Sequence, residues 1–136
     1  MVQNYKVITL CGSTRFKDQF IETQKRLTLE GCIVISVGLF GHSGDEEVWK
    51  PGTKEMLDDM HKRKIDMADE IFVINVGGYI GESTRSEIIY AEKTGKIVNY
   101  LEPIILLVLI PFVLSTLFAD DIGLGWSARS LCLHLL

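Results

Sequence analysis

The tripeptide Ser-Thr-Arg occurs twice in this 136-residue chain, each time after an apolar segment. A helix that begins at such a point presents free backbone N–H groups and a partial positive charge, which together bind anions. Hydroxyl and guanidinium groups add further donors. The two segments therefore predict a site for a small polar or phosphorylated ligand, built from Gly12, Ser13, Thr14, Arg15, Gly81, Ser83, Thr84 and Arg85. The alternative is that the hydroxyls only cap helices and the arginines are solvated.

Glu87 is the strongest candidate for a catalytic residue, because it follows the second tripeptide by one turn of the predicted helix. A carboxylate there can attack an anomeric carbon or activate water. Cleavage of a base from a sugar passes through an oxocarbenium-like state that such a carboxylate stabilises. The alternative is a capping box, in which Glu87 only bonds the backbone amide of Thr84.

Strand-like and helix-like segments alternate over residues 5–101. The patterns predict strands at 5–11, 32–37, 70–76 and 96–101 and helices at 14–30, 53–68 and 83–94. This order predicts an α/β fold with a flavodoxin/Rossmann-like, doubly wound parallel sheet of four to five strands in three α/β/α layers. With the first strand between the second and third, the loops after these strands share one rim.

Three further residues are expected at this rim. His42 and Asp45 lie in the Gly-rich loop at 38–45, and His42 is a candidate ligand contact, although a loop histidine is often only solvated. Tyr79 precedes the second tripeptide and either stacks on a base or simply packs.

The helix predicted at 53–68 has an apolar stripe that we expect to face the sheet, consisting of Met56, Leu57, Met60, Lys64 and Met67. The basic cluster at 61–64 is flanked by aspartates, which indicates an exposed helix face. The net charge of −4 also argues against a nucleic-acid partner.

The three cysteines, Cys11, Cys32 and Cys132, have no metal-ligand spacing, so the sequence predicts no metal and no cofactor. Cys11 and Cys32 lie in apolar segments, which suits reduced, buried thiols. With no signal-peptide pattern at the N-terminus, we expect a cytoplasmic protein.

The chain is expected to divide into an α/β domain at 1–102 and an apolar extension at 103–136. Residues 103–119 include no charged side chain, and Pro111 interrupts the run. Three alternatives remain open for this segment: a fifth strand with a packing or subunit interface, a membrane anchor, which is less favoured, and an extension outside the core.

Three motifs together resemble the nucleoside 2-deoxyribosyltransferase-like superfamily, over about residues 5–102. They are Gly-Ser-Thr-Arg-Phe at 12–16, Ala-Asp-Glu at 68–70 and Gly-Glu-Ser-Thr-Arg-Ser-Glu at 81–87. The superfamily includes deoxyribosyltransferases and nucleoside 5′-monophosphate N-glycosidases. The resemblance implies that Glu87 is the nucleophile on C1′, that both tripeptide segments bind sugar, phosphate or base, and that the protein is a homo-oligomer.

The chain departs from the family pattern at several positions. Thr9 stands where the deoxyribosyltransferases have a tyrosine, and Gly81 replaces a family Asp or Ser. His61 stands at the position of the second acidic residue, and Asp58 lies one turn earlier. We therefore take Asp58 and His61 as the further catalytic candidates.

The sequence thus predicts cleavage, by hydrolysis or transfer, of the N-glycosidic bond of a nucleoside 5′-monophosphate or deoxynucleoside. The alternative is a non-catalytic module that binds or senses a nucleotide.

Overall fold

The computed structural model describes residues 1–104, of which Met1–Glu102 form one compact unit. Its strands are β1 (Val7–Gly12), β2 (Ile33–Ile35), β3 (Glu70–Ile74) and β4 (Ile97–Tyr100). Its helices are α1 (Lys17–Leu29), α2 (Thr53–Asp66) and α3 (Glu82–Lys93). Short 3₁₀ turns lie at Thr14–Phe16, Gly41–Ser43, Glu46–Trp49 and Val76–Gly78.

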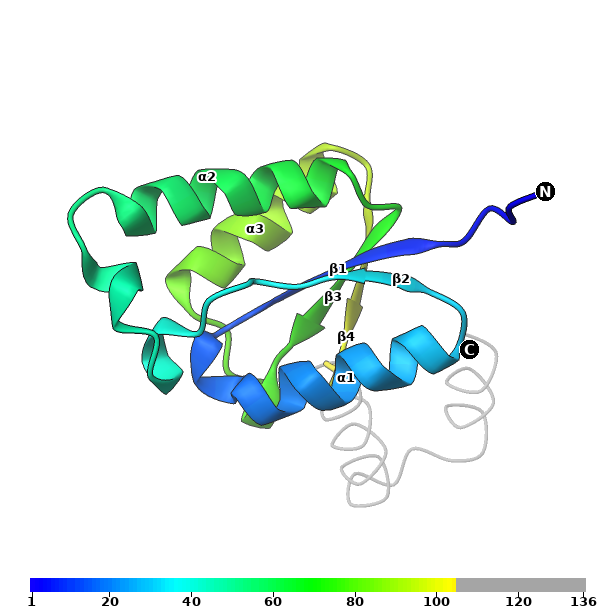
Figure 1. Cartoon of the computed structure of the whole chain (residues 1–136). Helices are drawn as coiled ribbons and strands as arrows, with labels where there is room; N and C mark the ends of the chain where they lie inside the picture. The colour runs from blue at the N-terminus through cyan, green and yellow to red at the C-terminus, as the bar shows by residue number, and fades with distance from the viewer. Residues whose placement is uncertain (105–136) are drawn as a thin grey trace, which may run out of the picture. The chain divides into compact units, whose positions relative to one another are not determined.

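The four strands form one parallel sheet in the order β2-β1-β3-β4, with helices on both faces (Figure 1). The predicted three-layer, Rossmann-like α/β fold and the central place of the first strand are therefore confirmed. A parallel sheet directs the carboxyl ends of its strands to one edge, so the loops after β1, β2 and β3 meet there.

Alternation along β1 divides the core into two layers, because successive side chains of a strand point to opposite faces. Ile8 and Leu10 pack with Phe20 and Leu27 of α1. Cys11 instead packs on the opposite face, with Ile65 of α2 and with Ile88 and Ala91 of α3. The central strands are buried from both sides, as their apolar sequences predict.

The predicted inner stripe of α2 is wrong for its three methionines. Met56, Met60 and Met67 are 44–57% exposed, whereas the buried residues of α2 are His61 and Ile65. One step along a helix turns the side chain by about 100°, so the burial of the line through His61 and Ile65 leaves the methionine line outside. The cluster at 61–64 is accordingly not an exposed face throughout.

None of the helices within residues 1–104 is long and apolar enough to cross a membrane. The predicted extension at 103–136, including nearly all of the apolar run at 103–119 and Cys132, lies outside the described residues.

Candidate functional site

A cavity of about 220 Å³ opens at the carboxyl ends of the strands. Its walls come from the loops after β1, β2 and β3 and from the helices α2 and α3. Of the residues predicted for the site, all but Asp45 and Arg85 line this cavity. Topology explains this convergence, since the predicted residues follow three strands that end at one edge.

The first Ser-Thr-Arg segment forms a 3₁₀ turn directly after β1. Ser13 is its N-cap, and the Ser13 hydroxyl accepts hydrogen bonds from the backbone N–H of Arg15 at 3.5 Å and from Arg15 Nε at 3.0 Å. The guanidinium lies 4.4 Å from the ring centroid of Tyr79, and its Nη2 donates to the Tyr79 hydroxyl at 3.3 Å. The ring thus holds Arg15 in the cavity wall, which favours the packing role for Tyr79.

Gly12 allows the chain to turn sharply into this segment. Its φ of +152° belongs to a region that side chains rarely adopt, and a Cβ there would lie 2.9 Å from the Ile74 carbonyl oxygen. The requirement for glycine is therefore both conformational and steric.

The loop after β2 is bonded to the first segment. Thr14 Oγ1 lies 2.8 Å from His42 Nδ1 and accepts a hydrogen bond from the backbone N–H of His42 at 3.2 Å. The Ser43 hydroxyl donates to the Thr14 carbonyl at 2.8 Å. Asp45 does not line the cavity, because its carboxylate accepts from the backbone N–H of Phe40 and closes its own loop. His42 is therefore a wall residue, whereas Asp45 is a loop cap.

The second Ser-Thr-Arg segment lies in the first turn of α3, in agreement with the helix predicted at 83–94. The helix begins at Glu82, and its N-cap is Gly81, which has no side chain to bond the free amides. Thr84 is 3% exposed and lines the cavity with Ser83, whereas Arg85 is exposed and lies outside it. The reason is again the helical rotation of about 100° from one residue to the next.

This placement also contradicts the capping-box alternative for Glu87. That motif needs Thr84 at the N-cap, but Thr84 lies inside the helix. Glu87 stands three positions after Thr84, so the two residues share the helix face that lines the cavity.

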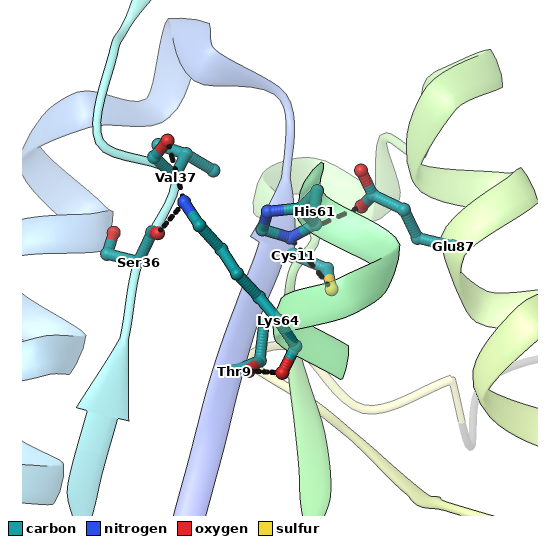
Figure 2. A network of polar contacts seen from close by, with 7 residues as sticks. All are labelled: Thr9, Cys11, Ser36, Val37, His61, Lys64 and Glu87. Carbon is teal, nitrogen blue, oxygen red and sulfur yellow. Dashed lines mark hydrogen bonds and ion pairs between the residues drawn. The ribbon is translucent and has the colours of Figure 1, made fainter. Parts of the chain in front are cut away.

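The Glu87 carboxylate is 13% exposed and lies beside two other buried groups. Glu87 Oε2 is 3.9 Å from His61 Nε2, and the Cys11 thiol sulfur is 3.5 Å from the same nitrogen. Figure 2 shows both side chains approaching this imidazole from different elements. Sequence reasoning predicted a buried thiol at Cys11 but had no signal that placed it beside Glu87.

Burial controls the protonation of this cluster. It raises the pKa of Glu87 to about 7, assisted by the negative charge of Asp58, and lowers the pKa of His61 to about 4, assisted by the positive charge of Lys64. Burial also raises the pKa of the Cys11 thiol. At neutral pH the imidazole is neutral, so the contact between His61 and Glu87 is not a salt bridge.

Lys64 ties α2 to the loop after β2. Its ammonium donates to the carbonyls of Ser36 at 2.9 Å and Val37 at 3.2 Å, while the Thr9 hydroxyl donates to the Lys64 carbonyl at 2.9 Å (Figure 2). Because Val37 lines the cavity, these bonds fix part of its wall. The Thr9 side chain thus points to α2.

Lys54 is a cavity residue that sequence reasoning missed. Its ammonium donates to Asp58 Oδ2 at 2.6 Å and to the Ser83 hydroxyl at 3.4 Å. The spacing of four residues between Lys54 and Asp58 is a visible helical pairing signal. The contact with Ser83 joins two helices and is visible only in the folded chain.

Within the described part of the chain, Cys11, His61 and Glu87 are the one group of three donors close enough to hold a metal ion.

No family model and no curated protein matches this chain.

Proposed function

We propose that residues 1–102 cleave the N-glycosidic bond of a nucleoside 5′-monophosphate or deoxynucleoside, with Glu87 as the nucleophile. The observation that carries the proposal is the position of Glu87, whose carboxylate shares one cavity with both Ser-Thr-Arg segments. This arrangement agrees with the resemblance to the nucleoside 2-deoxyribosyltransferase-like superfamily. A cavity of about 220 Å³ suits part of a nucleotide, with the remainder exposed to solvent.

The first segment is the proposed phosphate site. Arginine has five N–H donors, of which the contacts with Ser13 and Tyr79 use Nε and Nη2. The other donors of Arg15 remain for a phosphate, which the planar guanidinium binds well. A phosphorylated substrate is accordingly favoured over a free nucleoside.

The chemistry then needs two carboxyl groups. A Glu87 oxygen attacks C1′, the bond from C1′ to the base nitrogen breaks, and its electron pair leaves with the base. The leaving base takes its proton from water in the cavity, because the Asp58 carboxylate is paired with the Lys54 ammonium at 2.6 Å and has no proton to donate. Water then attacks C1′ of the glycosyl ester and passes a proton to the Asp58 carboxylate, which releases the sugar and restores the Glu87 carboxylate.

His61 has a different role in this proposal. Since its pKa is lowered to about 4, the imidazole is neutral at pH 7 and is a poor proton donor. It instead packs beside the Glu87 carboxyl group, with Nε2 at 3.9 Å from Oε2.

The second candidate function is a nucleotide-binding module without catalysis. The pKa of Glu87 favours it, because a carboxyl group with a pKa of about 7 is protonated in about half of the molecules at neutral pH. A protonated carboxyl group is no nucleophile.

The deciding experiment incubates the full chain, in buffer with a chelator, with nucleosides and their 5′-monophosphates and measures free base by chromatography. Glu87→Gln removes the nucleophile and keeps the shape of the side chain, while Glu92→Gln changes an exposed residue of the same helix. Base released by the unaltered chain and by Glu92→Gln, but not by Glu87→Gln, supports the glycosidase. Nucleotide binding without base release supports the module, and the absence of both refutes both.

A further inference from the structure

Cys11, His61 and Glu87 come from three different elements, β1, α2 and α3, and meet inside the domain. Each offers one donor atom, and these atoms lie within 4.8 Å of one another. The donor set is a thiolate sulfur, an imidazole nitrogen and a carboxylate oxygen. Zn²⁺ binds all three donor types, whereas Mg²⁺ and Ca²⁺ prefer oxygen alone.

The distance between the sulfur and nitrogen donors closely fits a zinc ion. With a Zn–S bond of about 2.3 Å and a Zn–N bond of about 2.0 Å, a tetrahedral ion separates sulfur and nitrogen by about 3.5 Å. The sulfur of Cys11 and Nε2 of His61 are 3.5 Å apart.

The carboxylate needs a small adjustment. The same geometry separates nitrogen and oxygen by about 3.3 Å, and Glu87 Oε2 is 3.9 Å from His61 Nε2. A change of a few tenths of an ångström lies within the reach of rotations in the long Glu87 side chain. Two of the three donors are therefore already placed, and the third lies next to them.

We infer that Cys11, His61 and Glu87 form a Zn²⁺ site with a fourth coordination position for water or a ligand from the cavity. Three protein ligands and one open position are the arrangement of exchangeable and catalytic zinc, whereas structural zinc has four protein ligands. His61 and Glu87 line the cavity, which supplies a route of entry for the ion. The thiol proton passes to the buffer when the ion binds, because the thiolate is the ligand.

Zinc at this site is an inhibitor of the proposed glycosidase. A Glu87 oxygen that coordinates the ion cannot attack C1′, so occupancy and base release exclude each other. Zinc binding itself is independent of the proposed function, since it depends only on the three donors.

The test is a titration of the full chain with Co²⁺ and Zn²⁺ in the absence of nucleotide. The background protein carries Cys32→Ser and Cys132→Ser, which leaves Cys11 as its only thiol. Co²⁺ reports a thiolate ligand through a charge-transfer absorption band, and competition with Zn²⁺ gives the zinc affinity. The expected result is one equivalent of Co²⁺ with this band.

The variants assign the ligands. Cys11→Ser should abolish the band. His61→Gln and Glu87→Gln should each weaken Zn²⁺ binding by more than about 100-fold, since the loss of even an outer partner costs 10–100-fold. Circular dichroism checks that each variant is folded, and Glu87→Gln retains the shape of its side chain.

His42→Gln is the matched control, because His42 lines the same cavity outside the trio. It should bind Zn²⁺ with unchanged affinity. A background protein without the band, or Cys11→Ser with unchanged affinity, overturns the inference. Since neither measurement involves substrate, failure here is distinguishable from failure of the proposed glycosidase.

Discussion

After β1, Ser13 caps a 3₁₀ turn and Arg15 folds over the Tyr79 ring into the cavity wall. After β3, the same tripeptide lies within α3, where Thr84 is buried and Arg85 is exposed. One sequence therefore has two local structures, because the helices begin at different points relative to it. The role of a short motif depends on its phase relative to the helix, since each step turns the side chain by about 100°.

Because of this difference, we expect the two segments to have different roles. The first segment presents the arginine and its free donors, whereas the second brings Thr84 and Glu87 to the cavity on one helix face. We accordingly expect the first segment to determine phosphate affinity and the helix of the second to determine turnover. The predictions below compare the two segments.

The largest effect is expected at the second segment, where Glu87→Gln should lower base release by at least about 10³-fold, since it removes the nucleophile. Arg15→Ala should lower kcat much less than Glu87→Gln does. Steady-state assays give kcat and KM for both variants. A normal kcat for Glu87→Gln would refute the proposal that Glu87 is the nucleophile.

Glu87 should also make stability depend on pH, whereas Arg15 keeps its charge at every pH in the range. The pKa of Glu87 is about 7 in the folded chain, against an ordinary value of 4.5. Between these pH values the folded state therefore binds more protons than the unfolded state. The contribution of Glu87 to the free energy of unfolding is present in full below pH 4.5 and is lost as the pH rises to 7.

The free energy of unfolding of Glu87→Gln, taken relative to that of the parent, should accordingly rise by roughly 2–3 kcal/mol from pH 5 to pH 8. Urea unfolding with a chelator present measures this difference. The lowered pKa of His61 affects the stability of both proteins equally. The stability that His61 contributes is lost as the pH falls from 6.5 towards 4. A difference that does not change with pH would show that the folded state does not raise the pKa of Glu87.

The two glycines that precede the segments should differ in their tolerance of a side chain. Gly12→Ala should destabilise the domain by about 1–3 kcal/mol, because its φ is +152° and the new Cβ meets the Ile74 carbonyl. Gly81→Ala should cost about 1 kcal/mol or less, because φ is −75° and the nearest atom, the Tyr79 hydroxyl, is 3.5 Å away. Thermal unfolding compares them, and equal losses would contradict the steric argument.

The smallest expected effect separates the two arginines. Arg15→Ala should raise the Kd for a nucleoside 5′-monophosphate about tenfold, the loss of one charge-assisted hydrogen bond. Arg85→Ala should leave it unchanged, because Arg85 lies outside the cavity. Calorimetry measures both values. Equal weakening by the two variants would mean that the second segment also binds phosphate.

The composition of the site was largely predictable. Twelve of the fourteen predicted residues line the cavity, whereas Asp45 and Arg85 do not. They follow strands whose order in a doubly wound sheet was itself predictable, and that order brings the loops together. The missed residue Lys54 enters the site through a contact between helices, for which a single sequence carries no signal.

The sequence by itself determined the alternation of strands and helices, the central place of β1 and the edge at which polar residues gather, because apolar periodicity and chain connectivity are local properties. Tertiary packing decided how each helix is rotated about its axis. It placed His61 inside and Met60 outside, and set Cys11 beside Glu87 across 76 positions of the chain. That rotation depends on which side chains fill the space against the sheet, and only the folded domain contains this information.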